Sequence, residues 1–310
     1  MASQSAAESV FDHVILLIPH SQLISLPQWL SDTFTILDGG VHEGGMTENK
    51  IVVFQDGVYL ELIAFVDGLN PQHRAMHPWG KQADGQIIHW AHTILSREEE
   101  EGSNKSEEKF RAVQARTEDS QVGIKYLDPE PGFRTMADGS KRIWANAIPS
   151  FDECKGLVHI NQQPFWTFDR TPRSLRAPLT PENTSHPSGV VGVAGISLVI
   201  KDERVLNNML PFYNAIFNKP GVKESPSSNV IRYRWEAAAP AHAEFGQRHF
   251  FLYQGTKEAF TEEEMVEANG EVPDIFIKLS LYTKGRAGSV KGTLVKGTLI
   301  TFDLIPIASS

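Results

Sequence analysis

The sequence is poor in cysteine and in positive charge. Cys154 is its single cysteine among 310 residues, which excludes an internal disulfide and any metal site built on several thiolates, and fits a reducing compartment. The 38 Asp and Glu residues outnumber the 29 Lys and Arg residues, and the net charge of −9 argues against a general nucleic-acid-binding protein. We therefore expect a small-molecule substrate and no nucleic-acid partner.

Long hydrophobic runs and the marks of a targeting leader are also missing. No apolar run approaches the roughly 18–20 residues that span a bilayer, and residues 1–10 have neither the basic start nor the apolar stretch of a secretory signal. We expect a cytoplasmic protein with no membrane partner. The sequence does contain 41% hydrophobic residues, including 17 Phe and 6 Trp, which is enough for a sizeable core.

Three widespread catalytic motifs do not occur. The sequence has no P-loop, no Gly-x-Gly-x-x-Gly that opens a helix after a strand, and no Gly-x-Ser-x-Gly. The surroundings of Cys154 do not match a nucleophile signature. Nucleotide cofactors and serine-hydrolase chemistry are therefore not expected.

The first 65 residues predict a strand, a helix and a hairpin. Residues 11–18 form a short β-branched apolar run that is typical of a buried strand. Residues 25–34 favour a helix, because a capping-box spacing begins the segment and its apolar residues recur on one face. The Asp-Gly-Gly at 38–40 ends the helical unit, and an Asp-Gly turn joins strands predicted at 50–55 and 58–65.

The same strand and helix order recurs twice, which makes repetition the main organisational feature. The second repeat has strands expected at 87–95, 123–127, 141–147 and 157–166, with a helix that begins near Asn104. The third has strands expected at 190–200, 230–236, 249–253 and 274–282, and helices at 204–218 and 261–269. Pro211 is expected to kink or restart its helix. A tandem pentapeptide at 291–300 predicts a strand pair or one long bent strand.

These repeats divide the chain into three parts of an α+β fold. Residues 10–170 hold a pair of βαβββ modules, and residues 190–310 hold a third, less regular module. Between them, residues 171–189 are rich in proline and read as a linker or an extended wrapping segment.

Three stretches carry a resemblance to a known family. They are Asp12-His13-Val-Ile-Leu, Gly39-Gly-Val-His42-Glu-Gly-Gly-Met-Thr-Glu-Asn49 and Tyr59-Leu-Glu61-Leu-Ile. Together they resemble the glyoxalase-like domain proteins of the vicinal oxygen chelate (glyoxalase/bleomycin resistance/dioxygenase) superfamily. The resemblance in sequence motifs covers about residues 10–190. The third repeat shares only the order of strands and helices. It implies βαβββ modules that pair into a curved, half-open barrel.

Two polar residues stand in otherwise apolar strands. A buried carboxylate such as Glu61 needs a cation, a metal or a proton. In the superfamily, the first and last strands of a module supply inward ligands to one divalent metal, and His13 and Glu61 occupy those positions. Alignment of Ala91-His92 with Asp12-His13 adds His92. The resemblance therefore implies one Zn, Ni, Mn or Fe ion held by His13, Glu61 and His92, with open coordination sites.

Other residues are candidates for catalysis and for substrate contact. The resemblance favours Glu61 and His42 as catalytic residues. The candidates for the substrate pocket are Asn49, Tyr59, Trp90, Trp144 and Trp166. Structural roles compete in each case, because His42 and Asn49 could cap a loop and most tryptophans are core residues. The remaining histidines, including His77 and His89, read as incidental, and Arg173 and Arg176 read as part of a solvated linker.

The resemblance leaves three functions open. The first is a metal-dependent lyase or isomerase of the glyoxalase type, acting on a small carbonyl or vicinal-oxygen compound. The second is an extradiol dioxygenase with non-haem Fe(II), since two histidines and one carboxylate also suit iron. The third is a metal-free protein that binds or sequesters a small molecule. A homodimer is compatible with each.

Overall fold

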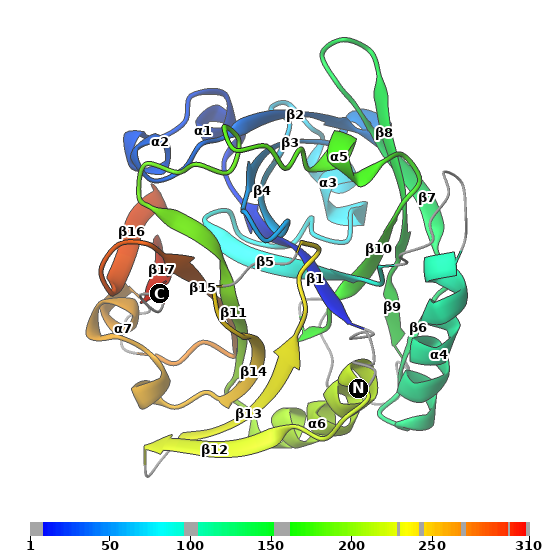
Figure 1. Ribbon diagram of the computed structural model, residues 1–310, viewed down its shortest axis with the longest axis vertical. Coiled ribbons are helices and arrows are strands. Elements are labelled where there is room, and N and C mark those ends of the chain that lie inside the picture. Colours follow the sequence, from blue (N-terminus) through cyan, green and yellow to red (C-terminus); the bar gives the residue numbers. More distant parts are fainter. Residues whose placement is uncertain are drawn as a thin grey trace.

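The strands of the computed structural model form two large sheets (Figure 1). The structure describes residues 9–95, 105–151, 162–227, 230–241, 245–267, 271–296 and 298–307. The predicted helix start at Asn104, most of the predicted strand at 157–166, and Cys154 lie outside these residues. None of the described helices is long and apolar enough to cross a membrane.

The first sheet is a closed eight-stranded barrel built from the two paired modules. In order around the barrel its strands are β1 (Val10–Leu17), β4 (Tyr59–Phe65), β3 (Thr47–Val53), β2 (Leu37–His42), β7 (Glu130–Thr135), β8 (Lys141–Ala147), β10 (Phe165–Asp169) and β5 (Gln86–Thr93). Antiparallel pairing of β1 with β5 and of β2 with β7 joins the modules at two seams and closes the barrel.

Several helices and one small sheet surround the barrel. They are α1 (His20–Ile24), α2 (Gln28–Thr33), the 3₁₀ turn η1 (Glu43–Gly45), α3 (Pro71–Met76), α4 (Lys105–Asp119) and the pair β6 (Ile124–Tyr126) and β9 (Pro149–Phe151). The strand predicted at 123–127 is β6, which pairs with β9 and takes no part in the barrel.

Strands β2 and β7 are present in the structure but were not predicted from the sequence. Gly39 and Gly40, expected to end the helical unit, lie inside β2 instead. A side chain at Gly39 would collide with Asn49 of β3, and one at Gly40 would collide with the backbone of Thr135. The two glycines therefore allow β2 to pack closely against both neighbouring strands, although glycine has a low strand propensity.

The second sheet has seven strands and repeats the arrangement of the first. Its order is β12 (Val222–Ser227), β13 (Val230–Ala237), β14 (Arg248–Gln254), β11 (Val190–Ile200), β15 (Ile275–Thr283), β17 (Thr298–Pro306) and β16 (Gly288–Val295). Strand β11 pairs parallel with β14 and antiparallel with β15, as β1 pairs with β4 and β5. The third module thus ends at β14, and β15–β17 are three strands of a further module.

Three local predictions in this half have clear outcomes. The helix α6 (Glu203–Phe217) continues through Pro211 without a restart. The tandem pentapeptide forms the antiparallel pair β16 and β17, in which Gly292 lies opposite Ile300, so the predicted strand pair is confirmed. The predicted acidic helix corresponds to α7 (Glu262–Glu267), which follows the 3₁₀ turn η4 (Lys257–Ala259).

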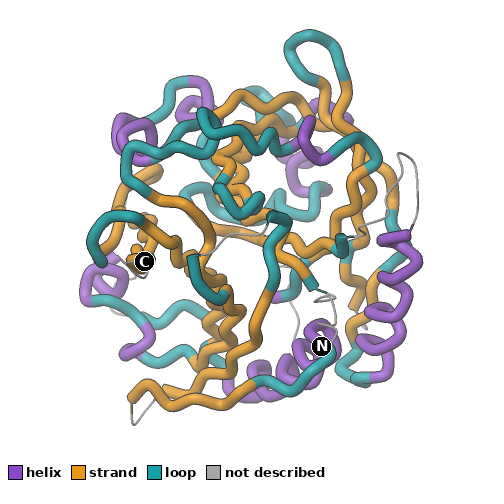
Figure 2. The backbone as a smooth tube through the Cα atoms, viewed as in Figure 1, coloured by secondary structure: helices purple, strands orange, loops and turns teal. Residues whose placement is uncertain are grey.

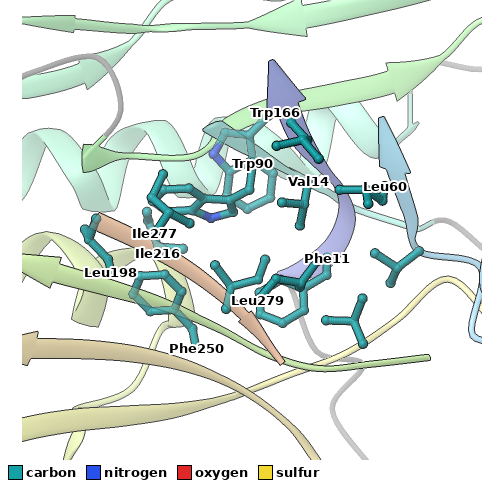
Figure 3. Close-up of a cluster of buried hydrophobic side chains, with 14 of the residues drawn as sticks. Phe11, Val14, Leu60, Trp90, Trp166, Leu198, Ile216, Phe250, Ile277 and Leu279 are labelled. Atoms are coloured by element: carbon teal, nitrogen blue, oxygen red, sulfur yellow. The ribbon is translucent and has the colours of Figure 1, made fainter. Parts of the chain in front are cut away.

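The main hydrophobic core lies between the outer face of the barrel and the second sheet. Figure 3 shows Trp90 and Trp166 of the barrel facing Phe250 and Leu198 of the second sheet. The rings of Trp90 and Phe250 stack with their centres 5.6 Å apart. Burial of each such side chain contributes about 1.5–3 kcal/mol, so the second sheet stabilises the barrel from outside.

The proline-rich segment at 171–189 wraps around the barrel. It contains the short helix α5 (Arg173–Arg176) and then runs mostly as loop to β11, as Figure 2 shows. Ser188 donates a hydrogen bond to the carbonyl oxygen of Thr33, and the His186 ring lies 3.2 Å from the carbonyl oxygen of Val53. Residues 171–189 were expected to form either a linker or an extended wrapping segment, and the structure shows the wrapping segment.

Candidate functional site

A cavity of about 250 Å³ lies inside the closed barrel. All eight barrel strands contribute to its lining, together with η1, α5 and the loop between α3 and β5. Its polar lining residues include His13, His42, Asn49, Glu61 and Arg134. Most of the remaining wall is apolar or aromatic, as expected for a small-molecule site.

Glu61 is the carboxylate at the centre of this site. It lies on β4 with 5% of its surface exposed. One carboxylate oxygen, Oε2, is 3.5 Å from Nε2 of His13, and the other, Oε1, is 3.5 Å from Nε2 of His42. Asn49 donates a hydrogen bond to Oε1. His13 and His42 lie on different strands, and each therefore directs its Nε2 at a different oxygen of the buried Glu61 carboxylate.

The surroundings of Glu61 keep it ionised. Burial alone would raise its pKa, but the charge interactions with His13 and His42, the Asn49 hydrogen bond and the charge of Arg134 together lower the pKa below its ordinary value of 4.5. Glu61 is therefore a carboxylate at neutral pH, which is the protonation state that a general base requires.

His13 is held firmly on the β1 side of the site. Its Nδ1 lies 2.6 Å from Oδ1 of Asp12, and its ring stacks on Tyr59 with centres 4.6 Å apart and planes 8° apart. The β1–β5 register shifts between Phe11 and His13, so Asp12 is an extra residue in β1. This bulge lets Asp12 and His13 form a pair although they are adjacent in a strand.

Arg176 lies behind this pair, although the sequence placed it in a solvated linker. It is only 2% exposed and lines the cavity. Its guanidinium bonds to Asp12, Asp169 and Tyr59. The carboxylates of Asp12 and Asp169 hold its pKa well above the ordinary value, in spite of its burial. Arg173 bonds to Asp12 as well. No local sequence signal linked these arginines to a carboxylate more than 160 positions away.

Arg134 of β7 is a second cationic residue that the sequence did not indicate. It is 2% exposed and donates to Oδ1 of Asn49 over 3.3 Å and to the carbonyl oxygen of Arg176 over 2.9 Å. Burial lowers its pKa, while Tyr59 and Glu61 act in the opposite direction. It therefore provides the counter-charge to Glu61 inside the cavity.

Aromatic side chains form much of the wall. Trp144 lines the cavity, and its ring meets that of His42 edge-on, with centres 5.9 Å apart. Phe165, Phe133 and Trp79 also line the cavity.

His77 and His89, which read as incidental in the sequence, belong to this wall too. Trp79 donates to Nδ1 of His89 over 3.1 Å. Burial lowers the pKa of both histidines to about 4, so both are neutral near pH 7.

Three predicted site residues lie elsewhere. His92, Trp90 and Trp166 point out of the barrel into the main core. His92 packs against Phe11 and Phe217 and binds Ser9 and Trp90 through its ring nitrogens, and burial lowers its pKa to about 3. The cause of the misplacement is the bulge at Asp12, because Phe11 pairs with His92 and His13 pairs with Ala91.

The registers identify the residues of the second module that correspond to His13 and Glu61. In the first module His13 pairs with Tyr59, and Glu61 lies two residues further along β4. In the second module Ala91 pairs with Phe165, and Thr167 lies two residues further along β10. At the positions equivalent to His13 and Glu61, the second module therefore has Ala91 and Thr167.

The structure does not bring the predicted ligands of a divalent metal together as a set. His13 and Glu61 are together, as the resemblance implies, but His92 is not, and His42 takes its place beside Glu61. Among the residues that the structure describes, no three His, Cys, Asp or Glu side chains form a group that could hold a metal ion.

Comparisons with known proteins agree with the architecture. A family model described as a glyoxalase-like domain matches residues 11–212. A crystal structure of a hypothetical protein from Staphylococcus aureus superposes with a TM-score of 0.60 at 14% identity, over 96% of this chain and 100% of that one.

Two further structures are more distant. A mutant of 4-hydroxymandelate synthase from Streptomyces coelicolor has a TM-score of 0.47 at 12% identity, over 89% of this chain and 71% of that one. A halotolerant catechol dioxygenase has a TM-score of 0.46 at 7% identity, over 97% and 88%. No curated protein matches the sequence significantly. At these identities the structural likenesses show the fold alone.

Proposed function

Since the chain belongs to the glyoxalase-like domain family, we propose that it is a small-molecule enzyme, a lyase or isomerase, whose reaction begins with removal of a proton next to a carbonyl group. Glu61 is the base. The observation that carries this proposal is a buried, ionised carboxylate inside a cavity, with a histidine Nε2 3.5 Å from each of its oxygens.

The charges of the cavity suit such a step. The C–H bond of the substrate breaks, its proton forms an O–H bond on Glu61, and the electron pair moves onto the carbonyl oxygen as an enolate. One negative charge thus passes from Glu61 to the substrate while Arg134 keeps its positive charge beside both. Because Arg134 and Glu61 are both buried, this fixed cation stabilises the enolate strongly.

The second half of the reaction returns the proton. Glu61 delivers it to a neighbouring carbon in an isomerase, or a leaving group departs from the enolate in a lyase. His42 and His13 lie close enough to exchange the proton with Glu61 once small adjustments shorten the 3.5 Å separations. Replacement of His42 should therefore lower kcat more than it weakens substrate binding.

The cavity limits the size and shape of the substrate. A cavity of about 250 Å³ admits only a small molecule. The aromatic walls formed by Trp144, Phe165 and Trp79 favour a flat, unsaturated portion. A small carbonyl compound with such a portion fits best.

Exchange of hydrogen for deuterium tests the proposal without knowledge of the full reaction. A panel of small 2-hydroxy ketones and 2-oxo aldehydes, with and without an aromatic ring, is incubated with the protein in D₂O and followed by proton NMR. We expect catalysed loss of the signal next to the carbonyl for at least one compound. Glu61→Gln should lower that rate by about 10²–10⁴-fold.

Glu48→Gln is the matched control. Glu48 lies on β3 and pairs with His20 rather than with the residues around Glu61, so its replacement should leave the exchange rate unchanged. Equal rates for wild type and Glu61→Gln would refute the assignment of the base. Tight binding of a panel member without exchange would instead indicate a binding protein.

Metal dependence is tested on the same samples. Elemental analysis of natively purified protein and exchange in the presence of a chelator should give no stoichiometric metal and no loss of rate. Loss of rate that Zn, Ni, Mn or Fe restores would contradict the base mechanism and support the metal-dependent alternatives, with oxygen-sensitive Fe(II) indicating a dioxygenase.

A further inference from the structure

We propose that Arg176 is a positioning residue that holds His13 with its proton on Nδ1 and its Nε2 directed at Glu61. The kinetic consequence of this arrangement rests on the function proposed above, but the arrangement itself does not. Arg176 comes from the segment at 171–189, so the proposal makes this wrapping segment part of the site.

All five N–H donors of Arg176 are used. Nε and one hydrogen of Nη2 bond to the two oxygens of Asp169, while Nη1 and the other hydrogen of Nη2 bond to the two oxygens of Asp12. The second hydrogen of Nη1 bonds to the Tyr59 hydroxyl over 2.7 Å. Only arginine presents five donors in one rigid plane. The guanidinium therefore fixes the orientation of all three partners.

Two of these partners touch His13 directly. Asp12 accepts the hydrogen of Nδ1 through Oδ1 over 2.6 Å, and Tyr59 stacks on the imidazole face with ring centres 4.6 Å apart. Arg176 thus controls the ring from its edge and from its face. With both contacts in place, the ring cannot rotate without breaking its bond to Asp12 or its stack on Tyr59.

The consequence for Glu61 follows from the chemistry of imidazole. When Asp12 accepts the hydrogen of Nδ1, Nε2 is the ring nitrogen that is left to face Glu61. That nitrogen is the atom that lies 3.5 Å from Oε2 of Glu61. His13 is thereby set to take up the proton that Glu61 removes, and to return it later.

Arg173 is a built-in control for this proposal. It lies on the same helix, α5, and also bonds to Asp12, yet it is 20% exposed at its side chain and its other contacts are Asp169 and the carbonyl oxygen of Gly57. A role that needs only positive charge near Asp12 would be shared by the two arginines. A role that needs the five-donor plane belongs to Arg176.

The test uses full-length protein with ¹⁵N-labelled histidine. In wild type, NMR should show His13 protonated on Nδ1 near pH 7, with a low-field, slowly exchanging proton signal, and His13→Gln assigns that signal by its loss. Arg176→Lys keeps the charge but removes the plane, so the signal should disappear and the ring should populate both tautomers. Arg173→Lys should preserve the wild-type signal.

The exchange assay provides the second readout. Arg176→Lys should lower kcat by about tenfold to a hundredfold with little change in KM, because misplacement of a catalytic group affects the chemical step. Arg173→Lys should retain the wild-type kcat. Should the panel give no turnover at all, the proposed function fails while the NMR result still decides the inference.

Three results would overturn the proposal. They are a wild-type His13 protonated on Nε2 alone, a His13 signal that survives in folded Arg176→Lys, and an equal loss of the signal in Arg173→Lys. Circular dichroism establishes that each variant is folded. Should Arg176→Lys fail to fold, the wild-type tautomer decides the matter alone.

Discussion

The two sheets of this protein have the same strand arrangement but different side chains at the same positions. In the barrel, β1 holds His13 opposite Tyr59, and Glu61 follows two residues later on β4. In the second sheet, β11 holds Gly195 opposite His249, and Phe251 follows two residues later on β14. Neither Gly195 nor Phe251 can move a proton. A repeated backbone therefore provides the frame for a site, while a few inward positions decide whether chemistry occurs there.

The second sheet has a structural role that the barrel depends on. It has seven strands rather than eight and remains open. Its apolar face covers the outer face of β1 and β5 (Figure 3). Trp90 and His92 point outward into this core and therefore away from the cavity.

The largest expected effect concerns the polar link between the two halves. Asp56, in the turn between β3 and β4, accepts hydrogen bonds from the backbone of Val193 and from Arg248, and all three are buried. Asp56→Ala leaves the Arg248 charge buried and unpaired, so it should lower the free energy of unfolding by about 3–5 kcal/mol. Urea denaturation measures this loss.

The exposed pair of Glu236 with Lys219 is the comparison for that measurement. Glu236→Ala should leave the free energy of unfolding almost unchanged, since exposed ion pairs contribute little. Equal effects of the two substitutions would mean that the halves are not coupled through Asp56.

The next prediction converts the second module of the barrel into a copy of the first. Ala91→His combined with Thr167→Glu places a histidine and a carboxylate at the positions equivalent to His13 and Glu61. Together the four side chains should bind Zn²⁺ at least about 100-fold more tightly than wild type does, which corresponds to ~2.7 kcal/mol. Titration calorimetry with Zn²⁺ measures the gain, and each single variant is a control. No gain would show that the register equivalence does not extend to side-chain geometry.

The smallest effect concerns the pH dependence of the outward-facing His92. Its folded pKa of about 3 lies below the unfolded value of 6.5, so the unfolded chain binds the proton more readily and stability falls as pH drops below 6.5. At pH 5 this contribution amounts to about 2 kcal/mol. His92→Leu should therefore lose about 2 kcal/mol less stability than wild type between pH 7 and pH 5.

Unfolding curves at several pH values measure that slope. His73→Leu, at an exposed position, should keep the wild-type slope. An unchanged slope in His92→Leu would mean that His92 is accessible to protons in the folded state.

Local sequence signals were sufficient for most of the fold. The buried strand β11 was predicted with its observed ends, and so was β8. Strand β2 was missed because its two glycines, required by close packing against Asn49 and Thr135, have the sequence character of a turn. Helix α6 also continues through Pro211, at an exposed position where local rules would place a break.

The site was predicted in part, for physical reasons that differ between residues. His13, Glu61, His42, Asn49 and Tyr59 lie together because each falls on the inner face of its own strand within one module. His92 was misplaced because a single bulged residue, Asp12, changes which face of β5 is equivalent to that of β1. Arg134 and Arg176 reach the site through long-range packing, which no local pattern encodes.

The central claim is that the reacting group belongs to the first module of the barrel. Its most direct test is the rate of deuterium exchange, measured on one active compound, for Glu61→Gln against Thr167→Val at the equivalent position of the second module. We predict a fall of about 10²–10⁴-fold for Glu61→Gln and a rate close to wild type for Thr167→Val. Comparable losses in both variants, or a loss in Thr167→Val alone, would contradict the account.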